Sequence, residues 1–317
     1  MASSQWRDIT DGFQKMPNSM KFLFGGMAGM AGSLVVHPLD LIKTRMQVAG
    51  TDGKKEFKNS FHVVQSVVSS QGIPGLYKGI GASLLRQATY TTARLGTYTW
   101  MNDQYRAMYS SEPSFVTRAS MGMIAGAIGA FVGTPADLAL IRMAADGRLP
   151  PAERRNYTNV VNALTRIVRE EGPLMLFSGC VPTVGRAIVV NMAQLATYSQ
   201  AKEHIKREYG IKDGIPLHFA ASMVSGLLTT IASMPVDIVK TRIQNMKTVN
   251  GKPEYSGGFD VLMKVIKNEG VLALWKGFTP YYCRLGPHTV LIFIFLEQFN
   301  RMYFKYVLGR EGGSSGM

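Results

Sequence analysis

Cysteine is almost absent from this sequence. Its 317 residues include only two, Cys180 and Cys283. So few cysteines exclude both the disulfide framework of a small secreted protein and a cysteine-rich metal cluster. We interpret both as small packing residues, which is the usual role of buried cysteine.

Motifs for catalysis and cofactor binding are absent as well. The chain has no phosphate-binding Walker loop, no cluster of histidine and cysteine at metal-ligand spacing, and no nucleophile elbow. We therefore expect no enzyme activity, no cofactor and no resident metal.

Charge is scarce. Charged residues make up 18% of the chain, and three runs of 18 residues, 22–39, 119–136 and 219–236, contain no acidic or basic side chain. A membrane-spanning helix needs roughly 17–25 such residues, so these runs predict membrane helices. The mean hydropathy is only +0.04. We interpret this value as short membrane helices that alternate with polar loops. We also expect some of these helices to face water on one side.

The charges that are present are mostly basic. The chain has 35 Lys and Arg against 21 Asp and Glu, for a net charge of +14. Such an excess favours anionic partners: nucleic acid, anionic lipid or small anionic substrates.

One pattern occurs three times. Each uncharged run ends in a proline (Pro38, Pro135 and Pro235) that is followed two residues later by an aspartate. Further on, two glycines recur with steps of 100 and then 98 residues: Gly72, Gly172 and Gly270, and Gly79, Gly179 and Gly277. Repetition at a fixed period determines the architecture. We predict repeats at 20–108, 113–207 and 214–308, a polar N-terminal tail at 1–19 and a disordered C-terminal tail at 309–317.

Each repeat is predicted to hold two spanning helices, which makes six in total. The first is the uncharged run, kinked at its proline, and the second is more polar. Between them lies a short amphipathic segment; in repeat one its apolar face carries Phe61, Val64, Val67 and Val68. Such segments are typical of helices that lie on a membrane surface.

Three arginines share one register position. Arg86, Arg186 and Arg284 are again 100 and 98 residues apart, within the second helices. An arginine inside a span is expensive and almost always faces protein or a water-filled cavity. Under threefold pseudo-symmetry the three form a ring at one depth, where they repel unless an anion or acids compensate them. The alternative is that each snorkels or pairs with backbone carbonyls at a helix kink.

The stripe that begins at Arg86 continues with Tyr90 and Arg94, one and two turns on. The counterparts of Arg94 in the other repeats are Gln194 and Ile292, so this charge breaks the symmetry. Asymmetric residues on a symmetric scaffold are where substrate selectivity is expected. Guanidinium groups bind carboxylates bidentately, so several arginines suit a molecule with two carboxylates.

An acid and a base follow each proline at a spacing of three residues. The three sets are Asp40 and Lys43, Asp137 and Leu140, and Asp237 and Lys240. Around a threefold axis each acid can reach the base of a neighbouring helix, and such ion pairs would form a gate. Since Leu140 replaces one base, two of three pairs can form. Ordinary charge preferences at helix ends are the alternative explanation. At the far ends of the second helices, Lys202 and Glu297 are the only opposite charges at corresponding positions.

The threefold Pro-x-Asp-x-x-Lys-x-Arg pattern, with an aromatic-Lys-Gly element about forty residues later, resembles the mitochondrial carrier family over nearly all of 18–308. That resemblance implies an all-α membrane protein: six transmembrane helices in a threefold pseudo-symmetric barrel around a water-filled cavity, with short surface helices on the matrix side. It also implies a multi-pass location in the mitochondrial inner membrane. The stretches 84–96, 133–151 and 284–290 are similar to members that exchange dicarboxylates.

The resemblance also implies roles for individual residues. The expected substrate-binding residues are Arg86, Tyr90, Arg94, Arg186, Gln194 and Arg284. The expected matrix gate comprises Asp40, Lys43, Asp137, Asp237 and Lys240, braced by Gln47 and Gln244. The expected cytosolic gate is Lys202 with Glu297. Cardiolipin is expected at helix-start amides near the six recurring glycines, which suits anion binding by free N–H groups.

We therefore expect an antiporter that exchanges 2-oxoglutarate for malate or a related dicarboxylate by alternating access. One alternative is a carrier of another small anion, such as phosphate, or a proton-leak (uncoupling) protein. Another is a basic scaffold or nucleic-acid-binding protein, although we expect no nucleic acid as partner.

Overall fold

The computed structural model describes residues 18–49, 59–109, 111, 113–149, 154–209, 215–246, 248–249 and 252–306. The predicted N-terminal tail lies outside these residues except for 18 and 19, and the predicted C-terminal tail lies wholly outside them. Six helices of 29 to 32 residues dominate: α2 (Asn18–Val48), α4 (Ile80–Tyr109), α5 (Phe115–Asp146), α7 (Cys180–Tyr209), α8 (Ile215–Asn245) and α10 (Phe278–Tyr306). At 1.5 Å per residue each is about 45 Å long, enough to cross a bilayer.

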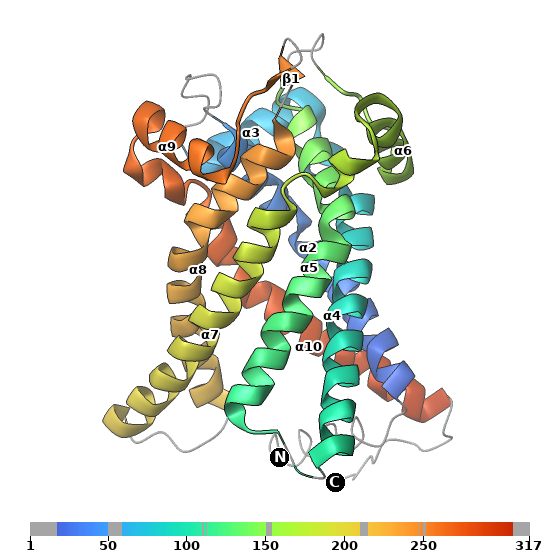
Figure 1. Ribbon diagram of the computed structural model, residues 1–317, viewed down its shortest axis with the longest axis vertical. Coiled ribbons are helices and arrows are strands. Elements are labelled where there is room, and N and C mark those ends of the chain that lie inside the picture. The colour runs from blue at the N-terminus through green and yellow to red at the C-terminus, as the bar shows by residue number, and fades with distance from the viewer. Residues whose placement is uncertain are drawn as a thin grey trace.

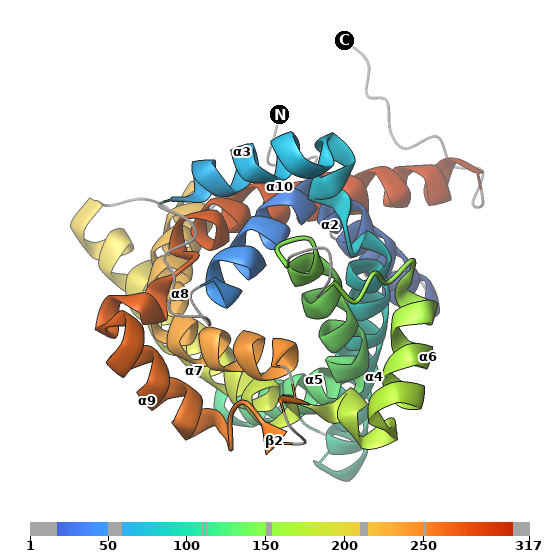
Figure 2. The same ribbon diagram turned by 90° about the horizontal axis from the view of Figure 1, so that it is seen from above.

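The six long helices form a closed ring (Figure 2). Contacts run from α2 to α4, α5, α7, α8, α10 and back to α2, and the most extensive ones join the second helix of one repeat to the first helix of the next. In the described chain, length and apolar composition single out three membrane-spanning stretches, Val116–Asp146, Pro173–Glu208 and Ala220–Asn245. The predicted threefold arrangement of six long helices is confirmed.

Three short helices lie together at one end of the ring (Figure 1): α3 (Ser60–Gln71), α6 (Val160–Glu171) and α9 (Gly258–Glu269). Each is followed by a 3-10 turn, η1 (Ile73–Tyr77), η3 (Pro173–Phe177) or η4 (Val271–Trp275). A two-stranded antiparallel hairpin, β1 (Thr248–Val249) with β2 (Lys252–Pro253), is an addition to the predicted all-helical fold. The Asn-Gly sequence between these strands favours such a hairpin.

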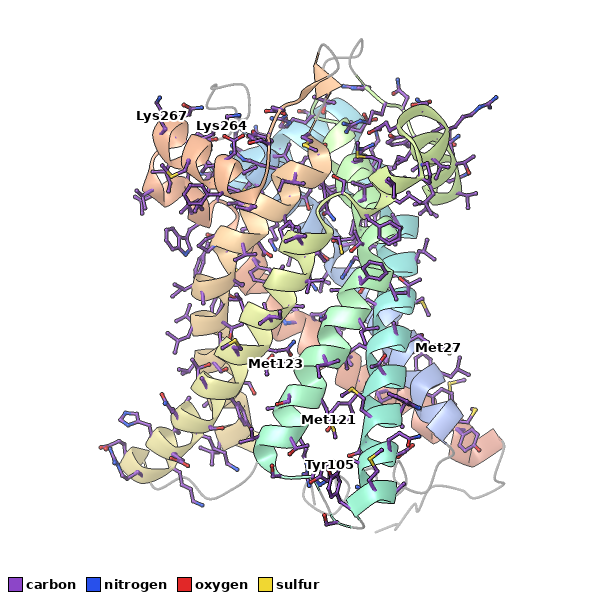
Figure 3. The ribbon with its side chains drawn as sticks, in the orientation of Figure 1. Met27, Tyr105, Met121, Met123, Lys264 and Lys267 are labelled. Atoms are coloured by element: carbon purple, nitrogen blue, oxygen red, sulfur yellow. The ribbon has the colours of Figure 1, made fainter. Side chains whose placement is uncertain are left out.

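The short helices bury a narrower face than predicted. In α3 the buried residues are Val63 and Val67, whereas Phe61 is 75% exposed. The predicted apolar face is therefore wrong at Phe61, which does not belong to the cluster in which Val63 and Val67 pack against α2. Exposed apolar residues suit a helix at a lipid surface. Figure 3 shows Lys264 and Lys267 of α9 at the end of the ring that holds the short helices.

The recurring glycines have a local structural reason. Gly72, Gly172 and Gly270 cap the short helices at φ of 70°, 94° and 87°, a region that side chains rarely adopt. Gly79, Gly179 and Gly277 also have positive φ just before α4, α7 and α10. Both sets turn the chain from the surface segment into the next long helix.

The aromatic residue before each of these turns packs against the kinked helix of its own repeat. A proline removes one N–H, which leaves the carbonyl four residues earlier without its helical partner. In repeat three that carbonyl is Ile231 O, and Trp275 Nε1 donates to it at 3.0 Å. In repeat two Phe177 stacks on Phe131, 5.0 Å between ring centroids. In repeat one Tyr77 stacks on His37.

Candidate functional site

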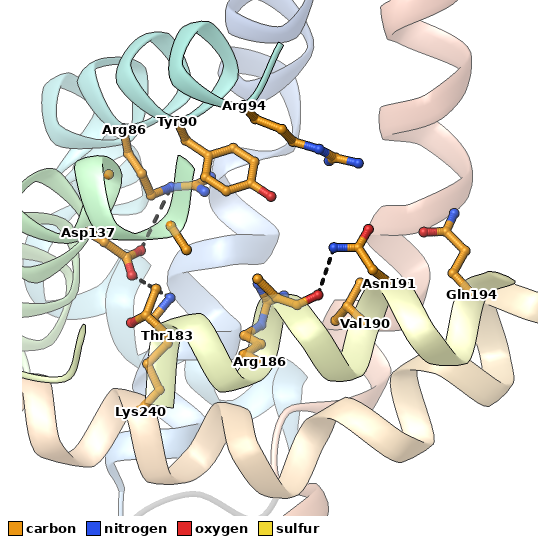
Figure 4. Close-up of a pocket in the computed structure, with 13 residues that line it drawn as sticks. Arg86, Tyr90, Arg94, Asp137, Thr183, Arg186, Val190, Asn191, Gln194 and Lys240 are labelled. Carbon is orange, nitrogen blue, oxygen red and sulfur yellow. Dashed lines mark hydrogen bonds and ion pairs between the residues drawn. The ribbon is translucent and has the colours of Figure 1, made fainter. Parts of the chain in front are cut away.

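A polar cavity lies inside the ring, between α4, α5, α7 and α8. Its volume is about 130 Å³. Five of the six predicted substrate-binding residues line it: Arg86, Tyr90, Arg94, Arg186 and Gln194. Figure 4 shows Arg86, Tyr90 and Arg94 along one helix, facing Arg186, Asn191 and Gln194 on another. Arg284, the sixth, is not among the lining residues.

The sequence reasoning missed Asn191 and Thr183, which also line the cavity. Both lie on α7, Thr183 three residues before Arg186 and Asn191 three residues before Gln194, so helical spacing from the two predicted residues is the signal that could have found them. Asn191 Nδ2 donates to Ala187 O at 2.8 Å, leaving its carbonyl oxygen available.

Glycines on α5 let α4 come close at this level. A Cβ placed on Gly129 would lie 3.0 Å from both Arg94 Cβ and Tyr90 O, and one on Gly133 would lie 3.3 Å from Tyr90 Cβ. Small residues at helix interfaces allow this kind of approach in membranes. The close approach of α5 therefore determines where Tyr90 and Arg94 of α4 lie.

The three arginines of the predicted ring are compensated by the three aspartates of the predicted gate. Ion pairs join Arg186 to Asp237 and Arg284 to Asp40, and Arg86 Nε lies 3.9 Å from Asp137 Oδ1. Arg86 and Asp137 are fifty-one positions apart, as are Arg186 and Asp237, and Arg284 is 244 positions from Asp40. Sequence proximity therefore gave no sign of these acids.

The gate lysines reach the same carboxylates from the other side. Lys43 Nζ of α2 contacts Asp237 Oδ2 of α8 at 2.6 Å, and Lys240 of α8 contacts Asp137 of α5. Leu140, which replaces the third base, is buried. Arg284 pairs with Asp40, so this acid has an arginine in place of the missing lysine.

The two predicted braces behave differently. Gln244 Nε2 lies 3.5 Å from Asp137 Oδ2, directly beside the Lys240 pair. Gln47 Oε1 accepts a hydrogen bond from Thr241 Oγ1 at 2.8 Å, and Gln47 Nε2 contacts Met234 Sδ at 3.9 Å. Gln47 thus ties α2 to α8 through a threonine rather than through an ion pair.

A second recurring set of arginines links the repeats. Each lies five residues after the aspartate that follows the proline. From Nε, each donates to a carbonyl near the end of a kinked helix in another repeat: Arg45 to Ala144 (3.1 Å), Arg142 to Gln244 (3.2 Å) and Arg242 to Gln47 (3.3 Å). The final carbonyls of a helix lack intrahelical donors, and a cation near them is favourable. These arginines are 1–3% exposed. Their recurrence was visible in the sequence, but their partners were not.

The cytosolic gate and the lipid sites are the remaining predicted sites. Lys202 of α7 is partly buried, whereas the side chain of Glu297 lies outside the described part of the chain. A surface pocket of about 510 Å³ includes Gly79 and the start of α6 at Asn159 and Val160. The Asn159 side chain caps this helix by accepting from Asn162 N.

Comparison with known proteins agrees with this geometry. The family model described as "Mitochondrial carrier protein" matches three segments of the chain, 14–109, 111–209 and 212–307. The chain belongs to the mitochondrial carrier family. Within this family, it is 62% identical over 297 residues to the Caenorhabditis elegans "Mitochondrial 2-oxoglutarate/malate carrier protein", covering 93% of this chain and 96% of that protein.

Other family members are similar over comparable lengths. The human protein of the same name is 59% identical over 293 residues, 92% of this chain and 93% of its own length. "Mitochondrial uncoupling protein 5" of Arabidopsis thaliana is 38% identical over 306 residues, 90% of this chain and 98% of its own.

Proposed function

We propose that this chain is an antiporter that exchanges 2-oxoglutarate for malate or related dicarboxylates across the mitochondrial inner membrane, as a multi-pass protein that opens alternately to cytosol and matrix. Relatives at 59–62% identity carry the name of a 2-oxoglutarate/malate carrier. The observation that carries the proposal is the cavity in which Arg86, Arg94 and Arg186 converge from two helices. A solute with two carboxylates matches such a set of guanidinium groups. Carriage of a solute requires no chemical catalysis.

In this proposal, the substrate opens the gate by exchanging ion-pair partners. Arg186 and Arg86 contact the gate aspartates Asp237 and Asp137 in the structure. A dicarboxylate that binds these arginines removes a counter-charge from each aspartate, which weakens the closed gate. Only a ligand with different affinity for the two states can shift such an equilibrium. The gate therefore opens only when substrate is bound. Because the protein can return only with another substrate molecule bound, transport in one direction is coupled to transport in the other.

Arg94, Tyr90 and Gln194 are the proposed selectivity residues. They lie farther along the same helices than the gate-linked arginines (Figure 4). One carboxylate of the substrate is then held by Arg86 or Arg186, and the other by Arg94. Arg284, paired with Asp40 outside the cavity lining, is proposed to join the substrate site when the gate opens.

The proposed closure on the cytosolic side is Lys202 with Glu297. We further propose that cardiolipin binds near the recurring glycines, because the pocket at Gly79 combines Lys78 with the helix start at Asn159. Helix N-termini and a basic side chain favour phosphate groups.

The test is uptake of labelled 2-oxoglutarate into proteoliposomes with and without malate inside. Uptake that requires internal malate is the expected result. Uptake without any counter-substrate would instead support a uniporter or a leak, which is the activity named by the uncoupling-protein relative. No uptake under either condition, from folded protein, would reject the substrate assignment.

A further inference from the structure

Tyr281 of α10 occupies a position where the three repeats differ. It lies three residues before Arg284, as Ser83 and Thr183 lie three residues before Arg86 and Arg186. Tyr281 is buried, at 7% exposed, and only repeat three places an aromatic ring here. A difference at a symmetric position calls for a specific partner.

Tyr281 and its partners form a cluster of side chains from four helices. Lys43 Nζ of α2 lies 3.8 Å from the centroid of the Tyr281 ring. Arg186 Nη2 of α7 donates to Tyr281 Oη at 2.9 Å. Both cations also contact the carboxylate of Asp237 on α8. The cluster therefore contains two cations, one carboxylate and one phenol.

The charge balance explains why a tyrosine is needed. Two cations share a single carboxylate that is 2% exposed, so one positive charge is not compensated by an acid within the cluster. The π face of the ring attracts Lys43, and the hydroxyl oxygen accepts from Arg186. Tyr281 thus supplies a second partner to each cation.

Repeat two shows the arrangement without the ring. Lys240 and Arg86 share Asp137 there, but Thr183 donates its hydroxyl to the carbonyl of Gly179, the residue just before its own helix. Arg86 Nε lies 3.9 Å from Asp137, and no hydrogen-bond partner for this buried Nε is found among the described residues. The arginine beside the tyrosine is therefore held on its gate acid more firmly than the arginine beside the threonine.

We propose that Tyr281 is a positioning residue that holds the substrate-binding Arg186 on the gate acid Asp237, so that the gate pair of repeat three opens only when substrate takes this arginine. The inference rests on the proposed exchange function. Substrate must displace Arg186 from both Asp237 and Tyr281. Asp237 then keeps only Lys43, and the gate is weakened at the moment when substrate is bound.

The test is the variant Tyr281→Phe, which keeps the ring beside Lys43 and removes the oxygen that accepts from Arg186. Because one competitor for Arg186 is lost, the KM for 2-oxoglutarate should fall about three- to tenfold. Uptake without internal malate should also increase. A general loss of structure would raise KM or reduce Vmax, so a fall in KM separates positioning from a merely structural role.

The matched control is Tyr282→Phe. Tyr282 is the next residue, and its ring stacks on Phe278 at 6.0 Å instead of contacting the gate. This variant should behave like the wild type. Tyr281→Thr, which installs the residue of repeat two, should increase uptake without internal malate further, because the ring is lost as well.

A KM for Tyr281→Phe equal to or above the wild-type value, with the wild type exchanging normally, would overturn the inference and leave the proposed function intact. Failure of the wild type to exchange would instead reject the proposed function. Thermal unfolding of the substrate-free protein then decides the inference. Tyr281→Phe should unfold at a lower temperature than Tyr282→Phe, and equal temperatures would overturn it.

Discussion

At the scale of single residues, the cavity and the gate use the same charges. Arg186 belongs to the cavity lining and also neutralises Asp237. Arg94 differs, since its side chain is exposed to the cavity and no ion pair to it is found among the described residues. Arg186 therefore combines a place in the cavity lining with an ion pair to a predicted gate acid, whereas Arg94 has only the first.

Replacing Arg94 should separate transport of dicarboxylates from any leak. Arg94→Ala should lower Vmax/KM for 2-oxoglutarate exchange by about 10- to 100-fold, because a charge-assisted contact to the second carboxylate is lost. A proton leak, measured as collapse of an imposed pH gradient, should be unaffected. Arg94→Lys is the control and should retain part of the activity. Unchanged exchange in Arg94→Ala would exclude this residue from the substrate site.

Leu140 is the residue that leaves the lysine gate incomplete. Leu140→Lys should add a pair with Asp40 and strengthen the closed gate by roughly 0–1 kcal/mol, so Vmax should fall by up to about fivefold with little change in KM. Leu140→Met, which keeps an uncharged side chain of similar size, should exchange at the wild-type rate. The comparison is made by initial exchange rates in proteoliposomes; equal rates for the two variants would show that position 140 does not reach the gate.

At the scale of helices, close backbone approach positions the site. The contact of α5 with α4 is formed at glycines, and the stripe of α4 that carries Tyr90 and Arg94 lies directly on it. At the matrix end, each kinked helix is covered by the aromatic residue of its own repeat, as Trp275 covers the kink at Pro235. The kinks in the helices and the contacts between them therefore depend on glycine and aromatic residues, which carry no charge.

An added methyl group on α5 tests this dependence. Gly129→Ala would place Cβ 3.0 Å from the backbone oxygen of Tyr90, so α4 must move by a few tenths of an ångström. Because a small misplacement of binding groups is costly, KM should rise about three- to tenfold. Gly122→Ala, on the same helix with no atom within 4 Å of the new Cβ, is the control. Equal KM values for the two variants in exchange assays would contradict the role given to Gly129.

At the scale of the whole molecule, buried arginines hold the three repeats together. Arg142 of α5 reaches the backbone of α8 and also pairs with Glu171 of its own surface helix. Arg242 reaches α2 and pairs with Glu269 at 2.5 Å. Repeat one has Gln71 at the corresponding position, where Arg45 Nη2 donates to its side-chain oxygen at 3.1 Å.

Removing one of these acids should weaken the assembly of repeats. Glu171→Gln leaves Arg142, 1% exposed, without a carboxylate partner and should cost about 1–3 kcal/mol, a fall in Tm of several degrees. Glu170→Gln is the control, because Glu170 is an exposed residue paired with Arg166 at i,i+4 and should shift Tm by at most about one degree. Thermal unfolding in detergent measures both. Equal shifts would contradict the role given to Glu171.

Much of this molecule followed from the sequence alone. The repeat, the six long helices, the three surface helices and the register of Arg86, Arg186 and Arg284 are periodic features, and period is a property of the chain. The pairing of Lys43 with Asp237 and of Lys240 with Asp137 also followed, because threefold symmetry relates their positions. The hairpin of β1 and β2 was missed although the Asn-Gly sequence between its strands favours it. The buried face of α3 was missed because it depends on packing against α2.

What only the tertiary structure decided is which charges meet. Asp40 pairs with Arg284, and Arg186 with Asp237 and Tyr281, across separations that no spacing rule reaches. The reason is physical. Periodicity fixes the face and depth of a side chain on its own helix, but partners are chosen by the distances between helices, which depend on kinks and glycine contacts. The cavity and its link to the gate are properties of that packing.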